Sequence, residues 1–258
     1  MKITVLGCGG SAGVPEIACQ CEVCMSANPK NKRTRVSVLV ETQGKRLLID
    51  TSPDLRQQAI SNGISHIDAI LYTHDHADHI HGIDDVRLFN VAADASLPAY
   101  GDAKTLAALR ARFAYLMQPK PASGVWFRPS LTGVEIQPPT PFDVQGLRVT
   151  PVLQQHAQVT SLGFRIGRFA YSTDVNGFSD ASFAALEGLD VWVVDCLRYT
   201  PSVTHAHLEM TLGWVEKLKP KRTVFTHMAH QFEYEKLARE LPPGIEPGYD
   251  GMVLELVD

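Results

Sequence analysis

The stretch THDHADHIHG, residues 73–82, decides the fold of this chain. It begins where the apolar run AILYT (69–73), a predicted strand, ends, and it carries His74, His76, Asp78 and His79 in the spacing H-x-H-x-D-H. On a tight loop, His74 and His76 can face one metal ion while Asp78 and His79 turn toward another. Imidazole and carboxylate together suit Zn²⁺, Mn²⁺ or iron. The motif therefore predicts a metal site at the end of this strand.

Three further donors follow later predicted strands. His156 comes after LRVTPV (147–152), Asp174 after FAYST (169–173) and His227 after RTVFT (222–226). In open α/β folds the carboxyl ends of strands form the edge where ligands gather. A single histidine at a strand end is more often an ordinary core or surface residue, so the prediction depends on the whole set. Together with the 73–82 motif, these donors are enough for two metal ions.

Strand and helix patterns alternate along both halves of the chain, which predicts a layered α/β fold. The predicted strands are 3–6, 36–41, 46–50, 69–73, 147–152, 169–173, 191–195, 222–226 and 252–256. The predicted helices are 53–63, 85–94, 102–117, 179–189, 208–219 and 234–242. Residues 118–143 are rich in proline and are expected to be irregular. Because no linker or repeat divides the chain, we expect a single domain over residues 1–258.

Length and composition narrow the class of protein. The chain has 258 residues, of which 45% are hydrophobic and 20% charged, with a formal net charge of −4. This charge provides no general attraction for nucleic acid or anionic lipid, so we expect neither as a partner. The start, MKITVLGCGG, lacks the apolar core of a signal peptide, and no apolar run reaches the ~18 residues of a membrane span. We therefore expect a cytoplasmic protein.

The five cysteines are unevenly placed. Cys19, Cys21 and Cys24 lie together in CQCEVC, whereas Cys8 and Cys196 stand alone. In a reducing compartment such a group indicates metal binding or redox chemistry rather than disulfides. Three thiolates are one ligand short of a tetrahedral zinc site, and a coincidental cluster of packed thiols is the alternative.

Taken together, THDHADH, the later His156, the STD that ends at Asp174 and the TH that ends at His227 resemble the metallo-β-lactamase superfamily. The resemblance implies a four-layer αβ/βα sandwich with mixed sheets and a dinuclear metal centre of Mn²⁺ or Zn²⁺. It assigns His74, His76 and His156 to the first metal and Asp78, His79 and His227 to the second, with Asp174 as the bridge. Flavo-diiron members carry Glu in place of the second histidine of the loop. His76 therefore favours hydrolysis over redox chemistry.

A second resemblance concerns the two ends of the chain. The opening GCGGSAGVP (7–15) is similar to that of the subgroup containing tRNase Z and the PhnP-type phosphodiesterases of the carbon–phosphorus lyase pathway. The pairing of CxCxxC with a late THxxH is similar to the PhnP type, where it forms a structural zinc site. This implies a Cys₃His site of Cys19, Cys21, Cys24 and His230. A closed site of this kind contributes folding energy and takes no part in turnover.

Three further residues receive roles. In PhnP-type enzymes a histidine matching His205, in TPSVTHAHLEMTL (200–212), contacts substrate and assists the leaving group; His207 is a nearby competitor. His205 and Asp78 are thus the candidate catalytic residues, and His205 and His207 the candidate substrate-binding residues. Asp50 is expected to orient a ligand histidine. The basic run NKRTR (31–35) is interpreted as a solvated loop, although Arg33 or Arg35 can reach a phosphate.

The resulting hypothesis is a dinuclear metal-dependent phosphodiesterase acting on a small phosphodiester, with cyclic ribosyl phosphates as one class of substrate. A tRNase Z-like endoribonuclease is the first alternative, but it needs a basic arm, and 118–143 offers only Lys120 and Arg128 as cations. Hydrolysis of an ester or thioester on the same fold is the second alternative, and a non-catalytic metal-binding protein the third. The resemblance is also compatible with a homodimer.

Overall fold

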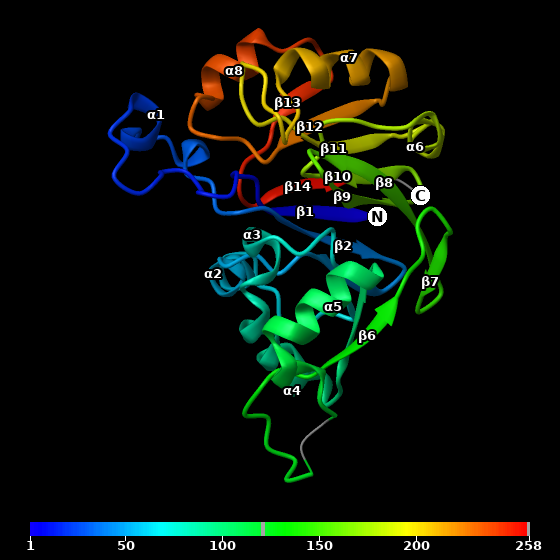
Figure 1. Cartoon of the computed structure of the whole chain (residues 1–258). Helices are drawn as coiled ribbons and strands as arrows, with labels where there is room; N and C mark the ends of the chain where they lie inside the picture. The colour runs from blue at the N-terminus through cyan, green and yellow to red at the C-terminus, as the bar shows by residue number, and fades with distance from the viewer. Residues whose placement is uncertain (120–121, 257–258) are drawn as a thin grey trace.

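The computed structural model describes residues 1–119 and 122–256, so Lys120 of the proline-rich stretch lies outside the described residues. Within these ranges the strands form two seven-stranded sheets (Figure 1). The first has the order β14-β1-β2-β3-β4-β5-β6: β1 (Lys2–Gly7), β2 (Ser37–Thr42), β3 (Lys45–Ile49), β4 (Ala69–Leu71), β5 (Leu97–Gly101), β6 (Leu131–Glu135) and β14 (Met252–Glu255). The second has the order β13-β12-β11-β10-β9-β8-β7: β7 (Phe142–Val144), β8 (Leu147–His156), β9 (Val159–Ile166), β10 (Phe169–Ser172), β11 (Val191–Asp195), β12 (Arg222–Thr226) and β13 (Ile245–Pro247).

The two sheets share one pattern of pairing. In the first, β14, β1, β2 and β3 pair antiparallel, and β3 to β6 pair parallel. In the second, β7 to β10 pair antiparallel, and β10 to β13 pair parallel. Each sheet is therefore mixed, as expected. The parallel strands end in loops that carry the candidate ligands.

Helices cover the outer faces of the two sheets (Figure 1). On the first sheet these are α2 (Leu55–Ser61), α3 (Ala77–Ile80), η2 (Ile83–Val86), α4 (Arg87–Ala93), α5 (Ala103–Arg112) and η3 (Ala114–Met117). On the second they are α6 (Asp180–Ala185), α7 (Leu208–Leu218) and α8 (Tyr234–Glu240). The short α1 (Glu22–Met25) and η1 (Pro29–Asn31) lie in the N-terminal loop. The order helices, sheet, sheet, helices is the four-layer sandwich predicted from the sequence.

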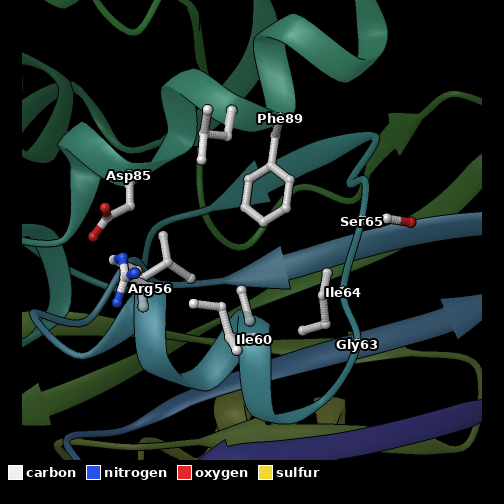
Figure 2. Close-up of a pocket in the computed structure, with 10 residues that line it drawn as sticks. Arg56, Ile60, Gly63, Ile64, Ser65, Asp85 and Phe89 are labelled. Atoms are coloured by element: carbon white, nitrogen blue, oxygen red, sulfur yellow. The ribbon is translucent and has the colours of Figure 1, made fainter.

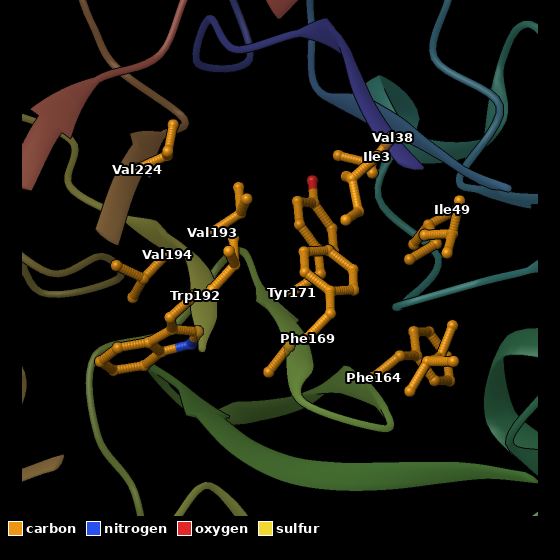
Figure 3. Packing of buried hydrophobic residues seen from close by; sticks show 14 of the residues in the cluster. Ile3, Val38, Ile49, Phe164, Phe169, Tyr171, Trp192, Val193, Val194 and Val224 are labelled. Atoms are coloured by element: carbon orange, nitrogen blue, oxygen red, sulfur yellow. The ribbon is translucent and has the colours of Figure 1, made fainter. Parts of the chain in front are cut away.

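The largest core lies between the sheets. Ile3, Val38 and Ile49 of the first sheet face Phe164 and Tyr171 of the second, all of them fully buried (Figure 3). Burying one such side chain contributes roughly 1.5–3 kcal/mol relative to leaving it exposed. This core holds the two sheets at a fixed separation and so fixes the position of the loops at their edge.

A second core lies between the first sheet and its helices. Strand β2 shows how one sequence serves both cores, because Val38 and Val40 enter the core between the sheets and Leu39, on the opposite face, packs with the helices. Successive strand residues alternate in this way. A strand that is buried on both faces does not alternate regularly between polar and apolar residues, and VSVLVE (36–41) is an example.

Several predicted elements need correction. The stretch 118–143 is not irregular throughout, since β6 and the start of β7 lie in it, and α5 ends at Arg112 rather than 117. The short strands β5, β7 and β13 and the long strand β9 were not predicted, and β8 runs four residues further than expected, to His156. Predicted helix starts were right at Asp102 and Ser179, whose side chains accept from the backbone N–H of Thr105 and Ser182.

The two ends of the described chain meet at the edge of the first sheet. Strand β1 pairs antiparallel with β14, and the amino group of Met1 donates to the carbonyl of Leu256 at 2.8 Å. None of the helices formed by the described residues is long and apolar enough to cross a membrane.

Candidate functional site

The structure brings the predicted donors into two groups that share one carboxylate. The first group is His74, His76, His156 and Asp174, and the second is Asp78, His79, Asp174 and His227. Within each group the donor atoms all lie within 4.8 Å of one another. Asp174 belongs to both: its Oδ1 lies 3.1 Å from His79 Nε2, and its Oδ2 lies 3.7 Å from both His74 Nε2 and His156 Nε2. This is the arrangement that a bridging ligand requires.

The backbone at the strand ends aims these side chains. Asp50, Asp174 and His227 each follow a strand and each adopt a left-handed conformation, with φ of 62°, 52° and 57°. Residues other than glycine adopt this region at a cost of order 1–3 kcal/mol, which the surrounding structure must offset. Three such positions around one cluster indicate that the chain direction there is determined by the site.

Neighbouring groups fix which nitrogen of each ring faces the cluster. Asp50, completely buried, has Oδ2 at 2.7 Å from His79 Nδ1 and also accepts from the N–H and the hydroxyl of Thr73. The Nδ1 of His156 lies 2.7 Å from the carbonyl of Thr204. With Nδ1 engaged as a donor, Nε2 of each ring is left with a lone pair toward the cluster. Asp50 thus stands where the sequence analysis expected it.

The buried atoms of the cluster fit the divalent metal ions that the donor set predicts. The Nε2 atoms of His74, His79 and His227 are buried and have no hydrogen-bond partner among the described residues. Leaving a buried polar atom without a partner costs about 1–3 kcal/mol. Metal ions bound between the rings and the carboxylates would use all three lone pairs, so the residues fit a dinuclear centre.

The carboxylates and the histidine rings of the cluster stabilise the charged forms of one another. Burial alone would raise the pKa of Asp174, but the neighbouring rings of His227 and His79 hold it well below its usual range. Burial likewise opposes the charged form of His227, but Asp174, Asp78 and Asp195 raise its pKa to about 9. The carboxylates therefore remain ionised across the neutral range and available to a cation.

The structure separates the two histidines of the 200–212 segment. His205 belongs to the cluster: its ring stacks on that of His227 at 4.4 Å between centroids, and its Nε2 lies 3.8 Å from Asp174 Oδ2. Its Nδ1 lies 2.9 Å from Oδ2 of the buried Asp195. His207 is the residue before α7 and forms none of these contacts. Its proposed contact with substrate therefore has no support in the geometry, whereas that of His205 has.

The cysteine group forms a separate cluster with His230. The Nδ1 of His230 lies 3.2, 3.9 and 3.7 Å from the sulfurs of Cys19, Cys21 and Cys24. Tetrahedral zinc with Zn–S near 2.3 Å and Zn–N near 2.05 Å places sulfur and nitrogen about 3.5 Å apart. The backbone N–H of Cys24, which points to Cys21 Sγ, lowers the pKa of that thiol. The four donors fit a closed zinc site.

Two histidines three residues apart thus face different clusters. Between His227 and His230, Met228 is fully buried: its N–H donates to the carbonyl of Cys8 and its carbonyl accepts from Gly10. This backbone pairing holds the N-terminal turn against the segment that follows β12. The two clusters are consequently joined by one short piece of chain.

The basic run 31–35 does not supply a phosphate ligand. Arg33 is buried and donates to the carbonyls of Ala229 and Phe232, which fastens the N-terminal loop to the segment around His230. Arg35 forms an ion pair with Asp54 at 2.6 Å. Both guanidinium groups are therefore structural, which corrects the solvated-loop interpretation as well as the suggested contact with phosphate.

An apolar hollow of about 510 Å³ lies elsewhere, between α2 and the η2–α4 segment (Figure 2). Ile60 and Phe89 are among its lining residues, with Arg56 and Asp85 at one side. None of the candidate ligands lines it. The hollow is therefore distinct from the metal cluster.

Comparison with known proteins agrees with this geometry. The profile of the beta-lactamase superfamily domain matches residues 45–228, from strand β3 to the residue after His227. The chain belongs to the metallo-β-lactamase superfamily, whose fold implies divalent metal binding and a hydrolase. Among solved structures it is similar to a diphosphatase from the PhnP family, with 40% identity and a TM-score of 0.91 over 99% of this chain and 98% of the other.

Two other similarities are more distant or partial. A protein named octanoyltransferase from Porphyromonas gingivalis is 36% identical over 98% of this chain, but the match covers 51% of that protein. The chain thus spans about half of this relative. The Zn²⁺-bound PqqB of Methylobacterium extorquens has a TM-score of 0.79 at 21% identity over 99% of this chain and all of the other, which indicates a shared fold.

Two contacts of the site were not predicted. Asp195, the last residue of the predicted strand 191–195, received no role in the sequence analysis, and the structure shows it paired with His205. The carbonyl of Thr204, next to His205 in the chain, orients His156. The position of Asp195 at the end of VWVVD (191–195), parallel to two strands that end in donors, was the available signal.

Proposed function

We propose that this protein is a metal-dependent phosphodiesterase that hydrolyses a small phosphodiester, with cyclic ribosyl phosphates among the candidate substrates. The observation that carries the proposal is Asp174, shared by two donor groups in which the buried Nε2 atoms of His74, His79 and His227 have no hydrogen-bond partner among the described residues. Two divalent ions, Mn²⁺ or Zn²⁺, would lower the pKa of a bound water and offset charge on phosphoryl oxygens. The Cys₃His group would hold a structural Zn²⁺.

The chain's own residues supply the remaining chemistry. Asp195 accepts from Nδ1–H of His205, so it orients the ring with Nε2 toward the cluster. The Nε2–H of His205 then faces the cluster, 3.8 Å from Asp174 Oδ2, where it can protonate the leaving oxygen. Asp78, the other candidate catalytic residue, lies 3.4 Å from His79 Nε2 and 3.5 Å from His227 Nε2, the position of a ligand.

The similar proteins favour phosphoryl over acyl transfer. The PhnP-family diphosphatase matches this chain along its whole length, whereas the octanoyltransferase is about twice as long as the matched region. About half of that protein therefore lies outside the similarity. Its name gives no reason to assign acyl transfer to the half that this chain resembles.

The geometry also weighs against a tRNase Z-like activity. In the proline-rich stretch, the guanidinium of Arg128 donates to carbonyls of its own loop, those of Gln118 and Pro119 among them. It is therefore used to fold the loop rather than to bind a phosphate backbone. A basic footprint for a long RNA is not supported.

The test combines metal analysis with hydrolysis of bis(p-nitrophenyl) phosphate. We expect about three metal ions per chain, with one zinc resistant to mild chelation, and diester cleavage stimulated by Mn²⁺. Replacing His205 by Gln should lower kcat by roughly 10²–10³-fold with the metal content unchanged. A fully metal-loaded protein that is inert toward the diester would refute the proposal.

A further inference from the structure

Asp75 stands inside the motif at residues 73–82, between the candidate ligands His74 and His76, but it belongs to none of the donor groups. Its side chain is buried and contacts helix α5 instead. The carboxylate oxygen Oδ2 accepts from Nη2 of Arg112 at 2.9 Å, and Oδ1 lies 3.5 Å from Nζ of Lys104. Both cations belong to α5. The carboxylate of Asp75 therefore fastens the motif to this helix.

Arg112 binds the backbone of Asp75 as well as its side chain. Its Nη1 donates to the carbonyl of Asp75 while its Nη2 donates to the carboxylate. That carbonyl belongs to the peptide unit between Asp75 and His76. Because a peptide unit is planar, its orientation also places the Cα of His76. The rigid fork of one guanidinium thus fixes the direction in which the chain enters His76.

His76 is a candidate ligand whose own ring has little to orient it. Three other rings of the cluster have Nδ1 next to an oxygen atom that orients them, namely those of His74, His79 and His156. His76 is exposed, and among the described residues its ring has no hydrogen-bond partner except Nε2 of His156, a member of the same donor group. The placement of the His76 ring therefore depends on the backbone that carries it.

Helix α5, which carries the two cations, is itself fixed to the first sheet. Leu106 and Leu109 of this helix are fully buried in the core between the sheet and its helices. Residues that are positioned by rigid elements hold a functional site more precisely than residues on free loops do. Through Arg112, the exposed end of the motif gains a support that is anchored in this core.

We infer that Arg112 is a positioning residue, which places His76 by way of Asp75 and so sets the affinity of the first donor group for its metal ion. This inference rests on the dinuclear centre of the proposed function. The two donor groups then have separate supports, because Asp50 orients His79 of the second group. Removing Arg112 should weaken the binding of one ion and leave the other in place.

The experiment is a calorimetric titration with Mn²⁺ of protein from which the active-site metals have been removed, so that ion binding is measured without substrate. The wild type should bind two ions. Arg112→Gln should weaken one of them about 10–100-fold, the range for residues behind a ligand histidine, and change the other by less than about twofold. Arg112→Lys keeps the charge but not the fork, so it should recover only part of the loss.

Two further backgrounds assign the weakened ion to the first group. Asp78→Asn removes a ligand of the second group alone, so the ion that remains should still respond to Arg112→Gln. His76→Gln removes the residue through which Arg112 acts, so the additional loss caused by Arg112→Gln should fall to less than about twofold. Equal losses in the two backgrounds would overturn the inference, because they would show that Arg112 acts on the cluster without His76.

Arg110→Gln is the matched control on the same helix and should leave both ion affinities unchanged. Arg110 is also exposed, but its guanidinium lies over strand β6, near Gly133. Far-UV circular dichroism and the zinc content of the Cys₃His cluster establish that each variant is folded. Arg112→Gln that binds both ions as tightly as the wild type would overturn the inference and leave the proposed function standing. A wild type that binds fewer than two ions would overturn the dinuclear centre together with the inference.

Discussion

The two donor clusters of this protein differ in what holds their ligands. In the cluster around Asp174 the candidate ligands lie at or after the ends of strands β4, β8, β10 and β12, and apart from the exposed His76 they are buried. In the Cys₃His cluster three of the four donors come from a loop with a single helical turn, and two of these, Cys19 and Cys21, are half-buried. The sheets would hold the first set in place without metal, whereas the thiols of the second set lie on a loop that is fastened to the segment around His230 by contacts such as those of Arg33 and would be held further by a metal ion.

This difference predicts two kinds of dependence. Removing a ligand from the first cluster should affect chemistry more than folding, and removing one from the second should do the reverse. The segment His227 to His230 contributes one residue to each cluster. A change in this segment is therefore the one most able to affect chemistry and folding together.

The largest expected effect is that of Asp174→Asn. The substitution keeps the shape of the side chain but removes the charge shared by both donor groups. We expect kcat on bis(p-nitrophenyl) phosphate to fall at least roughly a thousandfold, about 4 kcal/mol in the barrier. Metal analysis should show the ions of the Asp174 cluster reduced and the zinc of the Cys₃His cluster kept. Loss of the zinc as well would contradict the separation of the two clusters.

The converse prediction concerns Cys21→Ser. Zinc content should fall by one per chain, and the free energy of unfolding in urea should decrease by an amount on the order of 4 kcal/mol, the scale for losing a structural metal. At 25 °C the folded fraction should keep kcat within roughly fivefold of wild type, less than about 1 kcal/mol. Cys196→Ser, at a buried cysteine outside both clusters, is the control and should keep all metals. An inactive but folded Cys21 variant would make the Cys₃His cluster part of the catalytic site.

A smaller effect is expected at Asp50, which touches no candidate metal position and orients His79. Asp50→Asn should weaken metal binding at the second site about 10–100-fold, as is typical of residues behind a ligand histidine. Titration with Mn²⁺ should restore activity at higher concentration, with the same final kcat. If added metal fails to restore turnover, Asp50 has a role beyond positioning.

The smallest effect concerns Asp250, which joins the N-terminal turn to the rest of the protein through the N–H groups of Cys8 and Thr34. Burial raises its pKa from 3.8 to about 6. Because the folded state binds the proton more tightly, the contribution of Asp250 to stability is greatest below pH 3.8 and is lost as the pH rises through 6.

Between pH 7 and pH 5 the unfolding free energy of the wild type should therefore gain about 1 kcal/mol relative to Asp250→Asn. Urea unfolding of both proteins at the two pH values measures this difference. A gap that stays constant or changes in the opposite direction would show that the carboxyl is not held neutral by its surroundings.

Much of the fold could be predicted because several of its parallel strands are short runs rich in β-branched and aromatic residues. The ranges 191–195 and 222–226 match β11 and β12 to the residue. Strand β5 was missed because LPAYG contains proline and glycine, and β9 because Ser161 and Gly163 interrupt its pattern. Gly163 has a tertiary reason: a Cβ there would lie 2.5 Å from Gln154 Oε1 and 2.9 Å from the carbonyl of Tyr171. Such a neighbour cannot be inferred from local sequence.

The candidate site could likewise be predicted in part. The donors could be predicted because histidine, cysteine and carboxylate side chains at strand ends carry their chemistry in their identity. The contacts that orient them could not, since the carbonyl of Thr204, which orients His156, is a backbone atom that any residue provides. The choice of His205 over His207 likewise depended on the direction of the chain before α7.

The Cys₃His cluster also links parts of the chain that are made at different times. Cys24 and His230 are 206 residues apart, so a ribosome releases all three thiols long before the histidine exists. Zinc taken up by the nascent loop would have an open fourth position and would exchange readily. His230 follows β12 in the chain, so the site can be closed only once this segment has been made. We therefore expect slow zinc exchange to report that the last third of the protein has folded.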